Sequence, residues 1–221
     1  MDNFSNIVLN IPHSSDDGVL SSGWGRDVMP FVDRWTDWHT DVIFGSGDRR
    51  ILSVVFDHSR FVCDVERLIG DEKEKEGQGI IYEYFGEAKR DMSKIDRNWI
   101  MGMYYLHRNR LGKCLTDTSL LIDCHSFPSD ISDVDICIGF NDDWSKPDCN
   151  ILSLLHEHFS ENGYSVSYNN PYSNSIAPET GFTYKSVMID INKRTYMNGA
   201  KTDITKIRKT ILNLYDKILN I

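Results

Sequence analysis

The sequence predicts a three-layer α/β domain, with helices on both faces of one central sheet. Candidate strands and candidate helices interleave along the chain, which is the pattern of this architecture. Several candidate strands are continuous apolar runs instead of alternating ones, as expected where both faces of a sheet are covered. No internal repeat, linker or shift in composition divides the chain, so we expect residues 1–221 to form a single domain.

Apolar runs and helical spacings define the expected elements. The expected strands are 5–11, 51–56, 59–65, 119–124, 134–140, 164–168 and 185–191. The expected helices are 36–45, roughly 88–112, 148–162 and 201–220. The last helix is the clearest, because its isoleucines and leucine recur at helical spacing with charged residues between them.

Composition limits the classes of protein to consider. The net charge is −9, and a general nucleic-acid binder needs a basic face, so we expect no nucleic-acid partner. No apolar run approaches the roughly 20 residues of a membrane span, and the N-terminus has no signal-peptide pattern, so we expect a cytoplasmic protein without membrane contact. The five cysteines have no CxxC spacing, which argues against a disulfide framework and a Cys-rich zinc site.

Two apolar strands run into the same polar pair. The segment Ile7-Val8-Leu9-Asn10-Ile11-Pro12 leads to His13-Ser14, and Leu120-Leu121-Ile122-Asp123-Cys124 leads to His125-Ser126. Ligands and catalytic groups of an open α/β sheet collect beyond the carboxyl ends of its strands, and histidine is the commonest protein metal ligand. This pattern leaves two interpretations of His13 and His125, as ligands of one metal ion or as ordinary polar residues. A serine nucleophile is rejected because no Gly-x-Ser-x-Gly elbow is present.

A metal site would need a third ligand. Catalytic zinc typically takes three protein ligands and leaves a fourth position for water, so a carboxylate or a further histidine is expected. The candidates are Asp37, His39, Asp41 and Glu66. Asp123 lies two residues before His125, on the same side of the expected strand, where it could orient an imidazole as a hydrogen-bond acceptor.

Two arginines flank the expected strand 59–65. Arg60 and Arg67 could form surface ion pairs, or they could bind a substrate carboxylate, whose shape guanidinium matches with two hydrogen bonds. The loop 169–178 is turn-rich and by default only a connection, but its amide and hydroxyl groups would suit a substrate-binding loop. The spacing leaves these alternatives open.

Asp190 interrupts a late apolar strand, where a carboxylate must be paired or hydrogen-bonded. It could be a structural acid neutralised by Lys193 or Arg194. It could equally be a general base that activates water, a role that Asp and Glu often fill. His107 falls in an expected helix and is by default a surface or packing residue.

Six motifs stand in one order along residues 11–197. They are Ile-Pro-His-Ser-Ser, Thr-Asp-Trp-His-Thr-Asp, Arg-Phe-Val-Cys-Asp-Val-Glu-Arg, Asp-Cys-His-Ser, Asn-Pro-Tyr-Ser and Ile-Asp-Ile-Asn-Lys-Arg-Thr-Tyr-Met. Together they resemble the N-formylglutamate amidohydrolase family, which is similar to the zinc carboxypeptidases and aspartoacylase. The resemblance implies a mixed central sheet flanked by helices, the zinc-carboxypeptidase-like (phosphorylase/hydrolase-like) fold.

The resemblance also implies a metal centre and a general base. One zinc ion would be bound by His13, His125 and Asp37, with Glu66 as the reserve ligand. The family's general base is a Glu in the late strand, and Asp190 stands at that position here.

Substrate-binding residues follow from the same resemblance. Asp64-Val65-Glu66-Arg67 looks like the Asp-Leu-Asn-Arg block of aspartoacylase-like enzymes, with Glu in place of Asn. Arg67 would then hold a substrate carboxylate, together with Asn170 and Tyr172, while Arg60 would polarise the scissile carbonyl.

The expected function is therefore that of a zinc-dependent amidohydrolase. Its substrate would be a small N-acyl amino acid, such as N-formylglutamate, or a short peptide. One alternative is a metallo-carboxypeptidase or a cell-wall peptide amidase. A second is a catalytically inactive binding protein on the same fold, motivated by the departures from the family pattern at Glu66 and Asp190.

Overall fold

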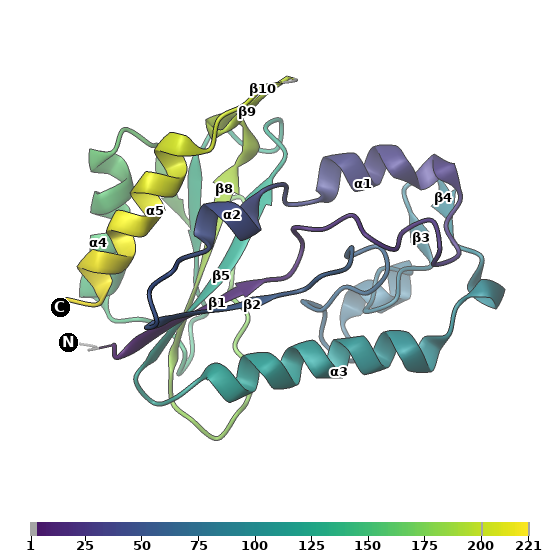
Figure 1. The fold of residues 1–221 in the computed structure, drawn as a ribbon, viewed down its shortest axis with the longest axis horizontal. Coiled ribbons are helices and arrows are strands. Elements are labelled where there is room, and N and C mark those ends of the chain that lie inside the picture. Colours follow the sequence, from purple (N-terminus) through teal and green to yellow (C-terminus); the bar gives the residue numbers. More distant parts are fainter. Residues whose placement is uncertain (1–3, 200, 221) are drawn as a thin grey trace.

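A six-stranded sheet runs through the centre of the molecule (Figure 1). The computed structural model describes residues 4–199 and 201–220. The strand order is β2-β1-β5-β8-β6-β7. All neighbours pair in parallel except β6 and β8, which are antiparallel, so the predicted α/β class with a mixed sheet is confirmed. The strands are β1 (Asn6–Ile11), β2 (Ile51–Val55), β5 (Ser119–Phe127), β6 (Ile136–Gly139), β7 (Val166–Tyr168) and β8 (Lys185–Asn192).

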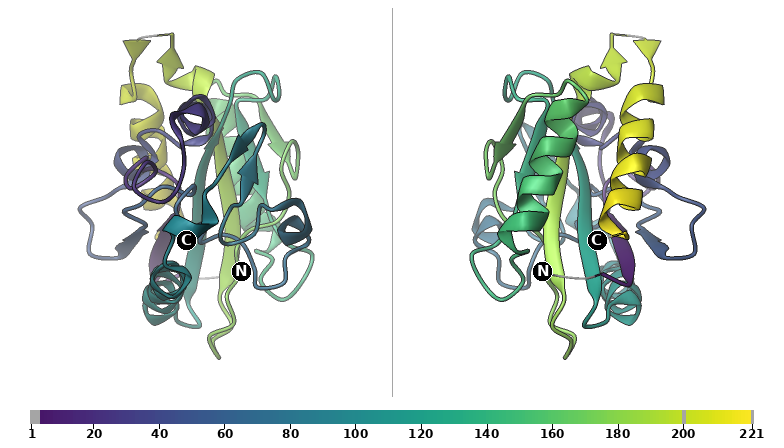
Figure 2. Two further views of the ribbon diagram at one scale, coloured as in Figure 1. Left: turned by 90° about the vertical axis from the view of Figure 1, so that its right-hand side faces the viewer. Right: turned by 90° about the vertical axis from the view of Figure 1, so that its left-hand side faces the viewer.

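Helices cover both faces of this sheet. The helices are α1 (Met29–Trp35), α2 (Thr40–Phe44), α3 (Arg97–Cys114), α4 (Cys149–Glu161) and α5 (Thr205–Ile218). Figure 2 shows α4 and α5 side by side on one face, and α2 packs on the same side against α5. The α3 helix packs against β1 and β2 from the other face. None of the described helices is long and apolar enough to cross a membrane.

The alternation of side chains along the strands separates an apolar face from a polar one. Leu9, Ile122 and Ile189 point into the core beneath α2, α4 and α5. Their polar neighbours in the strands point to the opposite face, the one that α3 covers at β1 and β2, near the carboxyl ends of three parallel strands. These neighbours are Asn10, Asp123, His125 and Asp190. The sheet therefore gathers polar side chains at one edge of one face, where ligands usually bind in such folds.

Two hairpins lie outside the sheet and shorten two of the predicted helices. β3 (Tyr84–Phe85) pairs with β4 (Ala88–Lys89), and β9 (Met197–Asn198) pairs with β10 (Lys201–Thr202). The predicted helix 88–112 therefore begins only at Arg97, where the Asp96 carboxylate caps the backbone N–H groups of Asn98 and Trp99. The predicted helix 201–220 begins at Thr205.

Two predicted elements were wrong. Residues 59–65 form turns instead of a strand, and their apolar side chains are buried all the same: Phe61 packs against Trp24 and Tyr82. The predicted helix 36–45 is reduced to α2, because the chain leaves α1 at Trp35 and is extended at Thr36. A short apolar run does not reveal whether it is buried as a strand or as a coil.

Candidate metal centre

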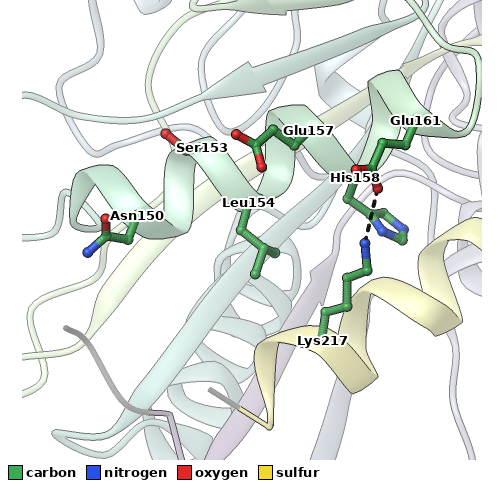
Figure 3. Close-up of a pocket in the computed structure, with 7 residues that line it drawn as sticks. All are labelled: Asn150, Ser153, Leu154, Glu157, His158, Glu161 and Lys217. Atoms are coloured by element: carbon green, nitrogen blue, oxygen red, sulfur yellow. Dashed lines mark hydrogen bonds and ion pairs between the residues drawn. The ribbon is translucent and has the colours of Figure 1, made fainter.

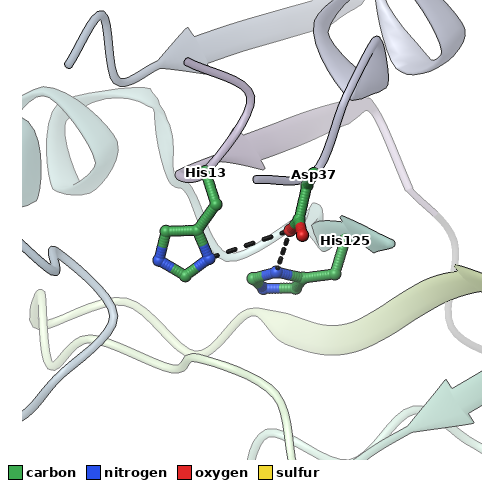
Figure 4. A group of neighbouring side chains, drawn as sticks. All are labelled: His13, Asp37 and His125. Carbon is green, nitrogen blue, oxygen red and sulfur yellow. Dashed lines mark hydrogen bonds and ion pairs between the residues drawn. The ribbon is translucent and has the colours of Figure 1, made fainter. Parts of the chain in front are cut away.

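Three side chains from separate segments converge beyond the carboxyl end of β1 (Figure 4). His13 follows β1, His125 lies near the end of β5, and Asp37 lies between α1 and α2. Asp37 Oδ2 is 3.0 Å from His125 Nδ1 and 3.8 Å from His13 Nδ1. The two rings are tilted against each other with centroids 5.2 Å apart. The structure thus brings together the three residues predicted as metal ligands.

The break between α1 and α2 places Asp37 in this group. Its backbone N–H donates to the carbonyl oxygen of His13 at 2.9 Å, which fixes two of the three residues to each other. The Thr40 hydroxyl donates to the Asp37 carbonyl at 2.8 Å, and His39 takes a left-handed backbone with φ of 65°. His39 and Asp41, the other candidates from this segment, are exposed.

A second carboxylate backs each imidazole. His13 Nε2 lies 2.9 Å from Asp64 Oδ1, and His125 Nε2 lies 3.2 Å from Asp123 Oδ1. The Nδ1 atoms of His13 and His125 therefore face Asp37, while their Nε2 atoms contact Asp64 and Asp123, respectively. A carboxylate behind the ring is the usual partner of a metal-binding histidine, because it fixes the tautomer and the orientation of the ring.

The donor set fits a divalent transition metal. His13 Nδ1 is buried and has no hydrogen-bond partner, and the three potential ligand atoms lie within 4.8 Å of one another. Against the effect of burial, Asp123 and Asp37 raise the pKa of His125 well above its usual range. Burial likewise opposes ionisation of Asp37, but His125 and His13 hold its pKa well below the usual range. Two imidazole nitrogens and one carboxylate oxygen are ligands that zinc prefers.

Glu66 belongs to a neighbouring group with Asp123 and His125. Its Oε2 lies 3.9 Å from His125 Nε2, on the nitrogen opposite the one that faces Asp37. Its Oε1 accepts a hydrogen bond from the Asn10 amide at 2.5 Å. Burial and the nearby Asp123 raise the pKa of Glu66 to about 8.

Asp190 lies beside His125, because the two are register partners in β8 and β5. Its side chain is buried, and Oδ1 has no hydrogen-bond partner. Burial raises the pKa of Asp190 to about 8. The two cations considered as partners are engaged elsewhere: Arg194 pairs with Asp135 at 3.0 Å, and Lys193 donates to the Arg34 carbonyl at 2.6 Å.

Asp64 is the centre of a cluster that includes both predicted arginines. Its Oδ2 lies 3.1 Å from Arg60 Nη2 and 3.5 Å from Arg67 Nε, and it also accepts a hydrogen bond from the Tyr82 hydroxyl. Burial opposes the negative charge, but Arg60 and His13 hold the pKa of Asp64 well below its usual range. Residues 59–65 are coiled, so Arg60 and Arg67 both contact Asp64. An extended strand would have placed the two arginines at its opposite ends.

The two loop residues differ in their surroundings. Tyr172 is half-buried, its ring lies 6.0 Å from that of Phe127, and the nearby Asp190 adds to the effect of burial in raising its pKa. Asn170 is exposed, and its carbonyl oxygen accepts a hydrogen bond from the Ser167 hydroxyl. Tyr172 is thus close to the metal-centre face of the sheet, whereas a substrate-binding role for Asn170 stays a prediction.

A separate hollow of about 370 Å³ lies between α4 and α5 (Figure 3). It is lined by Asn150, Ser153, Leu154, Glu157, His158, Glu161 and Lys217. Its ion pair, Glu161 with Lys217 at 3.4 Å, is solvent-exposed, and such pairs contribute little. Both groups of potential metal ligands in the described part of the chain lie elsewhere.

Sequence reasoning gave no role to three buried polar residues near the centre, Asn10, Asp64 and His107, of which His107 Nε2 lies 2.8 Å from Asn10 Oδ1. Asn10 interrupts the apolar run of β1 three residues before His13, which is the kind of signal that drew attention to Asp190. The contact of His107 with Asn10 had no such signal, because Asn10 lies in a strand that is distant in the sequence.

We expect Asp64→Asn to lower the free energy of unfolding by about 3 kcal/mol, because it leaves the partly buried Arg60 and Arg67 without their charged partner. Asp17→Asn is the matched control. It removes an exposed carboxylate 2.8 Å from His58 Nδ1, and should cost less than about 1 kcal/mol. Urea denaturation at pH 7 measures both, and equal losses would contradict the assignment of Asp64 as the central acid of this cluster.

The fold and the site define a class: α/β proteins that present a buried His/Asp group, able to bind a metal, beyond the carboxyl ends of parallel strands. Within this class, the chain belongs to the N-formylglutamate amidohydrolase family, whose model matches residues 5–197.

Solved structures share the fold. The crystal structure of N-formylglutamate amidohydrolase from Ralstonia eutropha JMP134 is similar with a TM-score of 0.74 and 17% identity, over 99% of this chain and 93% of that one. A gene product of Agrobacterium tumefaciens is similar with a TM-score of 0.67 and 17% identity, over 98% of this chain and 91% of that one. No curated protein matches the chain.

Proposed function

We propose that this protein is a zinc-dependent amidohydrolase that cleaves the amide bond of an N-acyl amino acid, with N-formylglutamate as the first substrate to test. One observation carries the proposal: the imidazoles of the buried His13 and the partly buried His125 present Nδ1 to one carboxylate, while further carboxylates lie against their Nε2 atoms. Membership in an amidohydrolase family supports the reaction type.

His13, Asp37 and His125 are the proposed ligands of one zinc ion. Glu66 faces Nε2 of His125, whereas Asp37 faces Nδ1 of both rings, so Asp37 is the better third ligand. Both oxygens of Glu66 face Asn10 and His125 inside the protein, which lessens the conflict between this acid and an anionic substrate.

When bound, zinc would polarise the amide carbonyl and make water more acidic. Asp190 accepts the proton of the attacking water and later delivers it to the leaving amine nitrogen. Arg60 donates a hydrogen bond to the carbonyl oxygen as negative charge develops there. Arg67, with Tyr172 and Asn170, holds the carboxylate of the substrate.

Chelation followed by zinc addition tests this function. We expect the stripped protein to be inactive, and one equivalent of zinc to restore hydrolysis of N-formylglutamate. The substrate panel should also contain N-acetylglutamate and short peptides, with release of the free amine as the measurement.

The outcomes separate the alternatives. Cleavage of peptides alone would favour a metallo-carboxypeptidase or a cell-wall peptide amidase. Stoichiometric zinc without turnover of any substrate would favour a binding protein. A protein that binds no zinc would refute the proposed function.

A further inference from the structure

A chain of polar contacts leads from α3 along the polar face of the sheet to the candidate metal centre. His107 Nε2 lies 2.8 Å from Asn10 Oδ1, and Asn10 Nδ2 donates to Asp123 Oδ1 at 2.9 Å. The same Asp123 oxygen lies 3.2 Å from His125 Nε2. We propose that His107 is a positioning residue, which acts through Asn10 and Asp123 to fix the ring of His125 for metal binding. This inference rests on the proposed function.

The chemistry of the neighbours fixes the orientation of the Asn10 amide. Its nitrogen donates to two acids, Glu66 Oε1 at 2.5 Å and Asp123 Oδ1 at 2.9 Å. The reverse orientation would place the amide oxygen, which can only accept, against the carboxylate of Asp123. Asn10 is fully buried, so its oxygen needs a donor from the protein, and His107 supplies it.

Only one tautomer of His107 is compatible with its contact to the Asn10 oxygen. Burial lowers its pKa to about 4, so the ring is neutral at pH 7 and carries one N–H. That N–H must be on Nε2, since the Asn10 oxygen can only accept. The ring is held edge-on to Phe56 with centroids 5.5 Å apart, and its Nδ1 has no hydrogen-bond partner.

Both carboxylate oxygens of Asp123 accept hydrogen bonds. Oδ1 accepts from Asn10, and Oδ2 accepts from the backbone N–H of Ile176 at 3.2 Å. Asn10 and Asp123 are register partners in β1 and β5, so the hydrogen bond between them is built on rigid strands. Without His107, the Asn10 oxygen would have no hydrogen-bond donor, and the Asn10 amide could rotate. Rotation of the amide would remove its hydrogen bond to Asp123, and the Asp123 carboxylate would then no longer hold the ring of His125 in place.

Two amide substitutions separate positioning from packing. In His107→Gln, the side-chain amide nitrogen can replace Nε2 and keep the hydrogen bond to Asn10. In His107→Asn, the amide is too short to reach. We expect H107N to weaken zinc affinity about tenfold, the lower end of the range for partners that orient a ligand. H107Q should bind zinc nearly as tightly as the unaltered protein.

His158 provides a matched control. It also lies in a helix, as Figure 3 shows for α4, and it is buried. Its Nε2 makes a 2.8 Å hydrogen bond to the Thr210 carbonyl, and its Nδ1 has no hydrogen-bond partner. H158N should lower stability as H107N does, without changing zinc affinity. Chelator competition gives the affinities, and the visible bands of the Co²⁺-loaded protein report the ligand geometry.

Each result bears on one proposal. Shifted Co²⁺ bands and weaker zinc binding in H107N, but not in H107Q or H158N, would support the positioning role. Equal zinc affinities of H107N and H158N would overturn it. Asn10→Ala tests the same link if H107N does not fold, and unchanged Co²⁺ bands there would also overturn it. If the unaltered protein binds no zinc, the proposed function fails before any variant is compared.

Discussion

Replacing His13 by alanine is expected to remove zinc binding and turnover together. The substitution deletes one of the two proposed nitrogen ligands and leaves the buried Asp64 without its imidazole partner at 2.9 Å. Loss of a group that only orients a ligand typically costs about 10- to 100-fold in affinity, so loss of a ligand itself should cost more than about 100-fold. Competition with a chelator of known affinity measures the change.

His58→Ala is the control for this experiment. His58 also lies against a carboxylate, Asp17 at 2.8 Å, but this pair is at the surface and outside the metal group. H58A should therefore bind zinc and hydrolyse substrate as the unaltered protein does. Full activity of H13A after chelation and zinc addition would contradict the metal centre.

Asp190→Asn is expected to lower kcat by about 10²- to 10⁴-fold, the usual contribution of a general acid–base group. Zinc affinity should not change, because Asp190 is a neighbour of His125 and not one of the proposed ligands. Burial raises the pKa of Asp190 to about 8, so ionisation of this group at neutral pH disfavours the folded state. The neutral amide should therefore leave the free energy of unfolding unchanged or higher.

Asp190→Glu tests the reach of the proposed base. Glutamate is one methylene longer and is the residue that the family resemblance implies at this position. D190E should therefore keep a higher kcat than D190N. If D190N retained the kcat of the unaltered protein, the proton acceptor would have to be another group.

Much of the fold could be predicted from the sequence, because the strongest signals were long and apolar. The strands 5–11, 119–124 and 185–191 correspond to β1, β5 and β8, which form the buried centre of the sheet. The prediction of a strand over residues 59–65 was wrong, because its apolar residues are buried in a coiled segment and their apolar character does not depend on a strand. In helix 36–45, the cause of the break is the hydrogen bond from Asp37 to the His13 carbonyl, a tertiary contact that no local pattern contains.

Site residues at strand ends could be predicted from the sequence. Residues that contact the site residues through long-range hydrogen bonds could not. His13 and His125 could be found because the carboxyl ends of neighbouring strands meet at one edge. Asp190 could be found because a carboxylate interrupts an otherwise apolar strand. The sequence offered Asp37 as one of four candidate third ligands, and the family resemblance selected it among them. The link between His107 and Asn10 joins residues 97 positions apart, and helical spacing says nothing about which strand a helix will cover.

The convergence of His13, Asp37 and His125 also has a consequence for folding. Asp37 and His125 are 88 positions apart, and they lie together in the fold in which β5 pairs with β1. In the denatured chain the three groups are scattered, so their affinity for a metal ion belongs to the native state. Zinc binding would then act as a reversible cross-link, and the folded fraction of the protein would rise with the free zinc concentration around it.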